Sequence, residues 1–265
     1  SRSGGSLQLV KIDVLTIFPG FFDSPLSTSI VARASEAGHV TIDLHDLRSY
    51  TGDRHRTVDD APFGGGGGMV LKPEPVAAAR RALDLQRGHC IYLTADGAPL
   101  DQDRCKRLSL KPHLVLLCGH YKGIDERVRQ FAVDEEISIG DYVLTGGEPA
   151  ALVLIDAVVR LIPGVLGNFS SAQEDSFHED ALLDCPWYTR PAEFEGLPVP
   201  EVLMNGNHEQ VRNWRRVQSL RRTYERRPEL LARVELDDDE RRMVDRWKQS
   251  ETTGGTTSAF ERDEL

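Results

Sequence analysis

The stretch SIGDYVLTGGE, Ser138 to Glu148, begins like a β-strand, closes with Gly146-Gly147 and places an acid where a helix could start. The residues that follow, PAALVLIDAVVRLIP (149–163), are apolar almost throughout and predict a buried helix. A glycine pair between a strand and a helix often receives a nucleotide, yet this pair belongs to neither a G-x-G-x-x-G fingerprint nor a Walker loop. The stretch therefore predicts strand, loop and helix, and the loop is either a ligand site or a tight turn.

Short apolar runs rich in β-branched residues occur along the chain before this stretch. Each is long enough for one strand, and helical patterns separate them. Strands that alternate with helices favour an α/β fold with a parallel sheet. The predicted strands are 10–18, 40–47, 90–94, 113–119 and, more weakly, 135–140, and the predicted helices are 29–38, 73–88, 123–132 and 147–164.

The pattern changes after Leu166, where the chain becomes polar and loses its apolar period. Such a segment is typical of a linker. Two helical patterns follow, 207–231 and 237–249, and Asp237 to Asp239 are candidate N-caps of the second. The expected organisation is a tag-like or disordered leader (1–9), an α/β domain (10–166), a flexible linker (167–184) and a helical domain with a frayed tail (185–265).

The composition is that of a soluble globular protein, with 40% hydrophobic and 28% charged residues among 265. No apolar run approaches the roughly 20 residues of a membrane span, so we expect no membrane partner. The four cysteines are scattered without a C-x-x-C pair. We therefore expect reduced thiols, no zinc site and a cytoplasmic location.

Charge is unevenly distributed along the chain. The net charge of −10 argues against indiscriminate binding to nucleic acid. Between Arg212 and Arg233, however, there are eight arginines and only two acidic residues, Glu225 and Glu229. This local excess of positive charge is either a polyanion-binding surface or a solvated helix face.

A second glycine-rich loop lies in DDAPFGGGGGMVLK, residues 59–72, with five consecutive glycines from Gly64 to Gly68. Glycine loses more conformational freedom on folding than any other residue, so such a run needs a reason. Close approach to a ligand, a mobile lid and a plain flexible linker are the alternatives. No Gly-Lys-Ser/Thr follows, which disfavours a phosphate loop of the Walker type.

Four long motifs make the chain resemble a known family. They are GHYKGIDERV (119–128), EEISIGDYVLTGGEPAALVLIDAVVRLIPGVLG (135–167), WYTRPAEFEGLPVPEVLMNGNHEQVRNWRR (187–216) and SLRRTYERRPELL (219–231). Together they look like the bacterial tRNA (guanine-37-N1)-methyltransferases, and the resemblance runs from about Val10 to Arg246.

That resemblance implies a fold and an activity. The fold is the SPOUT fold, a parallel α/β domain with a deep trefoil knot and a small helical C-terminal domain, and such knots are exceptions to the rule against threaded chains. The activity is transfer of a methyl group from S-adenosylmethionine to N1 of guanosine-37 in tRNA, next to the anticodon. The partners are tRNA with guanosine at position 37 and a second copy of the chain, with active sites at the subunit interface of a homodimer.

By resemblance, the loops that follow three of the strands hold S-adenosylmethionine, mainly through the backbone. The loop in SIGDYVLTGGE is then a cofactor site and not only a tight turn. The expected cofactor-binding residues are Tyr92, Leu93, Thr94, Ala95, Gly119, Tyr121, Lys122, Gly123, Ser138, Ile139, Gly140, Tyr142, Leu144, Gly146 and Gly147.

The resemblance also assigns two catalytic residues. Guanine N1 carries a proton at neutral pH, so methylation there needs a base and stabilisation of the charge that develops. Asp175 matches the family's general base, although from the sequence alone it is one of several loop acids and could be an N-cap. Arg160 matches the residue that stabilises the developing negative charge of the guanine, and a structural ion pair is the alternative.

The C-terminal part is expected to contact RNA. Aromatic rings can stack on bases, and arginines can contact phosphates. A helix that begins near Asn207 also offers free N–H groups to a phosphate. The expected RNA-binding residues are Trp187, Tyr188, Arg190, Asn205, His208, Arg215, Arg216 and Arg222.

The chain departs from the family pattern at several positions. Lys122 stands where the family usually has an acid, so magnesium dependence through that acid is doubtful and no metal ligand is predicted. We expect Lys122 to turn to solvent, to pair with Asp125 or Glu126, or to face tRNA phosphates. Gly67 and Ala95 stand where the family usually has proline, and His120 stands where it often has arginine.

Two other functions remain open from the sequence. A related knotted RNA methyltransferase would modify a different base, but such enzymes rarely resemble SLRRTYERRPELL. A catalytically impaired RNA-binding homologue is supported only by Lys122. Asp175 and Arg160 argue against that loss of catalysis.

Overall fold

The computed structural model describes residues 9–166 and 181–253. The chain forms two compact units, residues 1–168 and 169–265. Each unit is considered by itself.

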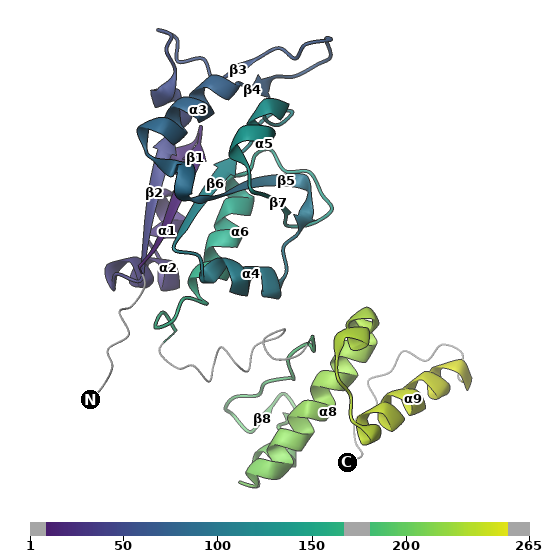
Figure 1. The fold of residues 1–265 in the computed structure, drawn as a ribbon. Coiled ribbons are helices and arrows are strands. Elements are labelled where there is room, and N and C mark those ends of the chain that lie inside the picture. The colour runs from purple at the N-terminus through teal and green to yellow at the C-terminus, as the bar shows by residue number, and fades with distance from the viewer. Residues whose placement is uncertain (1–8, 167–180, 254–265) are drawn as a thin grey trace. The chain divides into compact units, whose positions relative to one another are not determined.

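The first unit is built on a parallel sheet of five strands in the order β2-β1-β6-β5-β7 (Figure 1). All five strands predicted from the sequence are confirmed, and the strand at 90–94 is longer than expected because it continues past the cavity described below. The strands are β1 (Val10–Thr16), β2 (Val40–Asp46), β5 (His89–Pro99), β6 (His113–Cys118) and β7 (Glu135–Ser138).

Helices cover both faces of this sheet, as expected for parallel strands that are buried on both sides. The four predicted helices are present, and α1 and α4 are additional. The helices are α1 (Asp23–Leu26), α2 (Ser29–Glu36), α3 (Pro73–Ala82), α4 (Gln102–Ser109), α5 (Glu126–Ala132) and α6 (Glu148–Val159). Short 3₁₀ turns lie at Pro19–Phe22, Leu47–Tyr50 and Leu85–Arg87.

Alternation along the strands gives the unit two hydrophobic cores. Ile12, Leu114 and Ile137 pack against α2, α4 and α6 on one face. Leu15, Val115 and Leu117 pack against α3 and α5 on the other. α6 lies in the first core. It is apolar on almost every face of the helix, and seven of its residues are buried. No helix in the described part of the chain is both long and apolar enough to cross a membrane.

The glycine-rich segment at 59–72 forms a hairpin. Its strands β3 (Asp59–Asp60) and β4 (Val70–Leu71) pair antiparallel. Four of its five consecutive glycines have positive φ, at Gly64, Gly65, Gly66 and Gly68. The run therefore meets a backbone requirement that residues with a Cβ rarely satisfy.

The described part of the second unit is mainly helical. Its elements are a short hairpin of β8 (Glu193–Phe194) and β9 (Leu197–Pro198), the 3₁₀ turns Glu201–Leu203 and Pro228–Arg233, and the helices α8 (His208–Arg226) and α9 (Asp238–Thr253). The predicted helix at 207–231 ends earlier than expected, at Arg226. Pro228 explains this end because proline disfavours helical backbone at the residue before it.

A capping box begins α9. The Asp237 carboxylate accepts a hydrogen bond from the backbone N–H of Glu240 (2.8 Å), and the Glu240 carboxylate accepts one from the N–H of Asp237 (3.0 Å). The N-cap expected among Asp237 to Asp239 is thus confirmed at its first residue. All four cysteines are free and buried, as expected: Cys90, Cys105, Cys118 and Cys185.

Candidate functional site

A cavity of about 280 Å³ opens where β6 and β7 end, beside the middle of β5, which continues beyond it. Ligands of open α/β sheets bind at the carboxyl ends of strands, so this is the expected position for a site. The segments that contribute are residues 92–96 within β5 and the loops at 119–123 and 137–147. All fifteen residues expected to bind the cofactor line the cavity: Tyr92, Leu93, Thr94, Ala95, Gly119, Tyr121, Lys122, Gly123, Ser138, Ile139, Gly140, Tyr142, Leu144, Gly146 and Gly147.

Glycines allow two of these loops to touch. The N–H of Gly147 donates to the carbonyl of Gly119 (2.8 Å), and His120 and Gly146 form an isolated antiparallel bridge. A Cβ on Gly147 would lie 2.8 Å from the Cα of Cys118 and 3.0 Å from the N of Gly119. Both neighbours are backbone atoms that cannot move aside easily. The glycine pair therefore serves close backbone approach, which a tight turn alone would not require.

The loop after β7 is fixed by its own hydrogen bonds. The Ser138 hydroxyl accepts from the N–H of Gly140 (3.2 Å) and donates to the carbonyl of the same residue (3.1 Å). The Tyr142 hydroxyl donates to the carbonyl of Ile139 (3.1 Å). Gly140 has φ of 153°, so the turn between these residues uses backbone that favours glycine. Tyr142, Val143 and Leu144 remain exposed at the cavity.

Several lining residues were not foreseen from the sequence. They are Asp96, His120, Arg129, Ile137, Val143, Thr145 and Ala150. Most are neighbours of predicted residues, and only their position in the chain could have suggested them. Arg129 is different, because it reaches the cavity from α5.

A buried carboxylate directly follows the glycine pair in the chain. Glu148 is the first residue of α6 and is only 3% exposed. Its Oε1 accepts a hydrogen bond from the Thr16 hydroxyl at the end of β1 (2.7 Å), and Thr16 in turn accepts from the N–H of Phe18 (2.9 Å). The helix dipole favours a negative charge at this end of α6. The acid after the glycine pair was visible in the sequence, but its partner lies 132 residues away.

The glycine hairpin is attached to the edge of the cavity. The N–H of Lys122 donates to the carbonyl of Met69 (3.1 Å), and that of Leu71 donates to the carbonyl of Gly123 (3.0 Å). Burial raises the pKa of Tyr121, and a hydrogen bond to Asp59 raises it further. Backbone and side-chain bonds thus join the hairpin to the loop after β6.

Lys122 is exposed, and its aliphatic stem lies along the hairpin. A Cβ on Gly68 would be 3.1 Å from its Cε. Asp125 bonds instead to Arg127, and Glu126 lies 3.5 Å from Arg129. The exposed position agrees with the expectation that Lys122 turns to solvent. Among the residues the structure describes, no group of three or more His, Cys, Asp or Glu residues could hold a metal ion.

Neither of the two expected catalytic residues is among the described residues that line the cavity. Asp175 lies outside the described residues. Arg160 is half-buried at the C-terminal end of α6, where its backbone N–H donates to the backbone carbonyl of Asp156 (3.4 Å). It is not among the described residues that line the cavity.

The expected RNA-binding residues lie in the second unit, and two of them, Trp187 and Arg215, are in contact. The guanidinium of Arg215 stacks over the Trp187 ring at 4.3 Å, and the Trp187 indole N–H donates to Asp184 (2.5 Å). Tyr188 lies 6.3 Å from Trp214, measured between ring centroids. Trp187, Tyr188, Arg190, Asn205 and His208 are exposed.

Two of the expected arginines bond within the second unit. Arg216 pairs with Glu240 (2.7 Å) and joins α8 to α9. Arg222 donates to the carbonyl of Asp184 (3.1 Å). Both side chains therefore stabilise this unit, whatever else they contact.

The start of α8 offers fewer free N–H groups than the sequence suggested. The Asn207 side chain caps the helix and accepts hydrogen bonds from the N–H of Glu209 (3.1 Å) and of Gln210 (3.2 Å). Asparagine is among the preferred N-cap residues for this reason. A phosphate at this position would have to compete with the cap.

Comparison with known proteins gives a consistent result. The family model described as "tRNA (Guanine-1)-methyltransferase TrmD" matches residues 10–233. A relative from Chloroflexus aggregans is 56% identical over 228 residues, which cover 85% of this chain and 89% of the relative. Relatives from Moorella thermoacetica (52% over 240 residues; 89% and 96% covered) and Anoxybacillus flavithermus (49% over 245 residues; 91% and 100% covered) are also similar.

All three relatives carry the name tRNA (guanine-N(1)-)-methyltransferase. A family match over residues 10–233, with identities near one half across most of both chains, leaves no ambiguity about descent. The chain belongs to the tRNA (guanine-1)-methyltransferase family.

Proposed function

We propose that this protein transfers a methyl group from S-adenosylmethionine to N1 of guanosine in tRNA, at position 37 next to the anticodon. The observation that carries the proposal is the cavity beside the middle of β5 and the ends of β6 and β7. Fifteen residues assigned to the cofactor by resemblance come from three separate segments, and all fifteen line it. Membership of the family supplies the reaction class.

The cavity suits S-adenosylmethionine as a ligand. Its volume of about 280 Å³ is close to the lower end of the roughly 300–1,000 Å³ of small-molecule sites. Gly119, Gly146 and Gly147 leave backbone uncovered where a Cβ would clash with neighbouring atoms. Backbone N–H and C=O groups can recognise a heterocycle without adding a charge. When bound, S-adenosylmethionine supplies a methyl group already activated on a sulfonium.

Two residues carry the proposed chemistry. Asp175 takes the proton from N1 of guanine, a step that typically contributes 10²–10⁴-fold in rate, to order of magnitude. Arg160 stabilises the negative charge that develops on the guanine as this proton leaves. Both roles rest on the resemblance, because Asp175 lies outside the described residues and Arg160 is not among the described residues that line the cavity.

The proposal extends to the whole chain. Residues 10–166 form a cofactor-binding domain with a deep trefoil knot, residues 167–184 a linker, and residues 185–265 a tRNA-binding domain after a leader at 1–9. The family match over residues 10–233 supports the knot, because the resemblance to this family implies the SPOUT fold. Two copies form a homodimer with active sites at their interface, in the cytoplasm. The exposed Lys122 has no oxygen that could bind magnesium. We therefore propose that methyl transfer does not depend on an acidic residue at this position.

Methyl transfer to two tRNA transcripts tests the function. Labelled methyl from S-adenosylmethionine should enter a transcript with guanosine at 37, and an otherwise identical transcript with adenosine at 37 should stay unlabelled. Equal labelling of both would favour a knotted methyltransferase with a different target base. Cofactor and tRNA binding without transfer would indicate the catalytically impaired homologue instead.

A further inference from the structure

One wall of the cavity is a segment that leaves the sheet. β5 pairs with β7 so that Leu93 and Ala98 both lie opposite Ile137. The four residues between them, 94–97, therefore bulge out of the ladder, and the first three line the cavity. Gly97 brings the bulge against β7, since a Cβ there would be 2.5 Å from the N of Ile137. Something other than ladder hydrogen bonds must fix the tip of this bulge.

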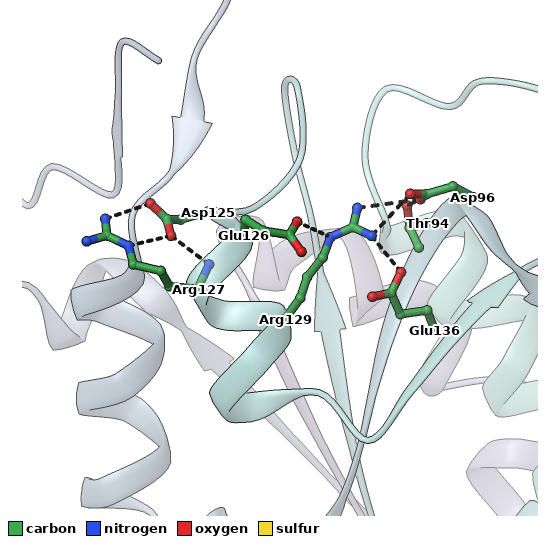
Figure 2. Close-up of polar contacts among 7 residues, drawn as sticks. All are labelled: Thr94, Asp96, Asp125, Glu126, Arg127, Arg129 and Glu136. Carbon is green, nitrogen blue, oxygen red and sulfur yellow. Dashed lines mark hydrogen bonds and ion pairs between the residues drawn. The ribbon is translucent and has the colours of Figure 1, made fainter. Parts of the chain in front are cut away.

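The Arg129 side chain reaches that tip from α5 (Figure 2). Its Nη1 donates to Asp96 Oδ2 (3.1 Å) in the bulge and to Glu136 Oε2 (2.6 Å) in β7. Its guanidinium carbon lies 5.0 Å from the centroid of the Tyr92 ring. One side chain thus contacts the bulge, the neighbouring strand and an aromatic residue of the cavity.

The charges around Arg129 favour this arrangement. Its side chain is 22% exposed, and burial alone would lower the pKa of Arg129, but the bond to Asp96 and the charges of Glu136 and Asp96 raise it. A hydrogen bond from Thr94 lowers the pKa of Asp96, and the bond from Arg129 lowers it further. The Asp96 carboxylate is therefore bonded once within the bulge and once to α5.

Tyr92 extends the effect to the loop after β6. A Cβ on Gly119 would lie 2.8 Å from the Tyr92 hydroxyl, and one on Gly123 would lie 3.1 Å from it. The ring therefore packs directly on two residues of the second cavity loop. Because Arg129 stacks on the same ring, it can restrain both loops together.

We propose that Arg129 is a positioning residue of the cofactor cavity, which holds the 94–97 bulge and Tyr92 in the arrangement that binds S-adenosylmethionine. The identity of the ligand rests on the proposed function. The contribution is pre-organisation: a loop already fixed in its binding arrangement loses less entropy when the ligand arrives. Loss of Arg129 should therefore weaken cofactor binding more than it slows the chemical step.

Arg127 provides a matched control on the same helix. It also forms a two-point bond to a carboxylate, Asp125, with both N–O distances 2.8 Å (Figure 2). Its side chain is 66% exposed, and neither partner is among the described residues that line the cavity. Removing it deletes a similar charge and a similar ion pair without touching the wall.

The test compares Arg129→Met with Arg127→Met in the full chain. Calorimetry with S-adenosylmethionine should give a dissociation constant raised about tenfold or more by Arg129→Met and less than about twofold by Arg127→Met. Amide hydrogen exchange without cofactor should become faster across residues 94–98 only in Arg129→Met. At saturating cofactor, the methyl-transfer rate of Arg129→Met should stay within about threefold of the wild-type rate.

A conservative variant and a partner variant complete the test. Arg129→Lys keeps the charge but cannot bond two carboxylates through a planar fork, so its dissociation constant should lie between wild type and Arg129→Met. If Arg129→Met does not fold, Asp96→Asn replaces it, with the same shifts expected in binding and exchange.

Equal binding and equal exchange in the Arg129 and Arg127 variants would overturn the proposal. So would a loss of transfer rate at saturating cofactor with unchanged affinity. Wild-type protein that binds the cofactor but methylates no tRNA would contradict the proposed function and leave the positioning role to be decided by binding and exchange.

Discussion

At the scale of single residues, the shape of the cavity depends most on Gly147, which has no side chain and so lets the loops after β6 and β7 touch. Gly147→Ala would place a Cβ 2.8 Å from the Cα of Cys118, so the loops must separate. We expect at least about tenfold weaker binding of S-adenosylmethionine, because the backbone groups would no longer converge on the cavity. Calorimetry measures this loss directly.

Gly67 is the matched control for that substitution. A Cβ there meets nothing within 4 Å, and its φ lies outside the range that disfavours side chains. Gly67→Ala should therefore bind the cofactor within about twofold of wild type. Equal losses in both variants would mean that close approach at Gly147 is not what shapes the cavity.

Asp13 makes the stability of the first unit depend on pH. Its carboxylate is fully buried between His45 and His113, each 2.6 Å away through Nε2, with Lys11 at 3.1 Å and Asp43 beyond that lysine. Burial raises the pKa of Asp13, but the bonds from the two imidazoles and from Lys11 outweigh it and lower the value to about 2.

A carboxyl pKa that is lower in the folded state stabilises the fold above the unfolded pKa, which for aspartate is about 4. The stabilisation, about 2 kcal/mol, is lost as the pH falls from about 4 to about 2. Urea unfolding between pH 5 and pH 2.5 should show that Asp13→Asn is less stable at pH 5 and has a flatter slope below pH 4. Asp43→Asn, which removes a half-exposed partner of the same Lys11, should keep the wild-type slope. Parallel slopes in all three proteins would contradict the role of Asp13.

At the scale of the elements, α8 carries the arginines that we expect to face tRNA, and the structure separates them into two kinds. Arg216 and Arg222 bond within the unit, whereas Arg212 is exposed and Arg215 stacks on the exposed Trp187. Replacing both Arg212 and Arg215 with glutamate should weaken tRNA binding and reduce its salt slope by about 1 for each phosphate that the protein no longer neutralises.

Binding measured from 50 to 300 mM salt tests this expectation, with Arg241→Glu on α9 as a control. Arg241 is also exposed and pairs with Asp238 (3.5 Å). If the double variant keeps its fold and its salt slope, these residues are not part of the tRNA surface. A similar reduction of the slope in the control would indicate a general charge effect rather than a defined interface.

The elements also show how far sequence patterns lead. Apolar period and β-branched runs predicted every strand of the parallel sheet, because the central strands β1 and β6 and the 90–94 part of β5 are largely buried and the edge strands β2 and β7 are partly buried. α4 was missed although Asp101 caps it by accepting from the N–H of Arg104 (2.8 Å), since the segment has few apolar residues. The 94–97 bulge could not be predicted, because it depends on the register between β5 and β7.

At the scale of the whole molecule, resemblance supplied what local patterns could not. The cavity joins three segments up to about fifty residues apart. Resemblance to the family assigned residues of all three segments to the cofactor, although no local pattern shows that they lie close together. Contacts such as Thr16–Glu148 and Arg129–Asp96 were invisible in the sequence because neither partner has a local pattern that requires the other. The knot, the homodimer and the role of Asp175 are proposed from the same resemblance.

The central claim is that this protein methylates N1 of guanosine-37, and one measurement tests it most directly. A tRNA transcript with guanosine at 37 is incubated with the protein and S-adenosylmethionine that carries a deuterated methyl group, and its nucleosides and fragments are analysed by mass spectrometry. We expect 1-methylguanosine that bears the deuterated methyl group, in the fragment that contains position 37. Labelled methyl in another nucleoside or at another position, or none at all from protein that binds both ligands, would contradict it.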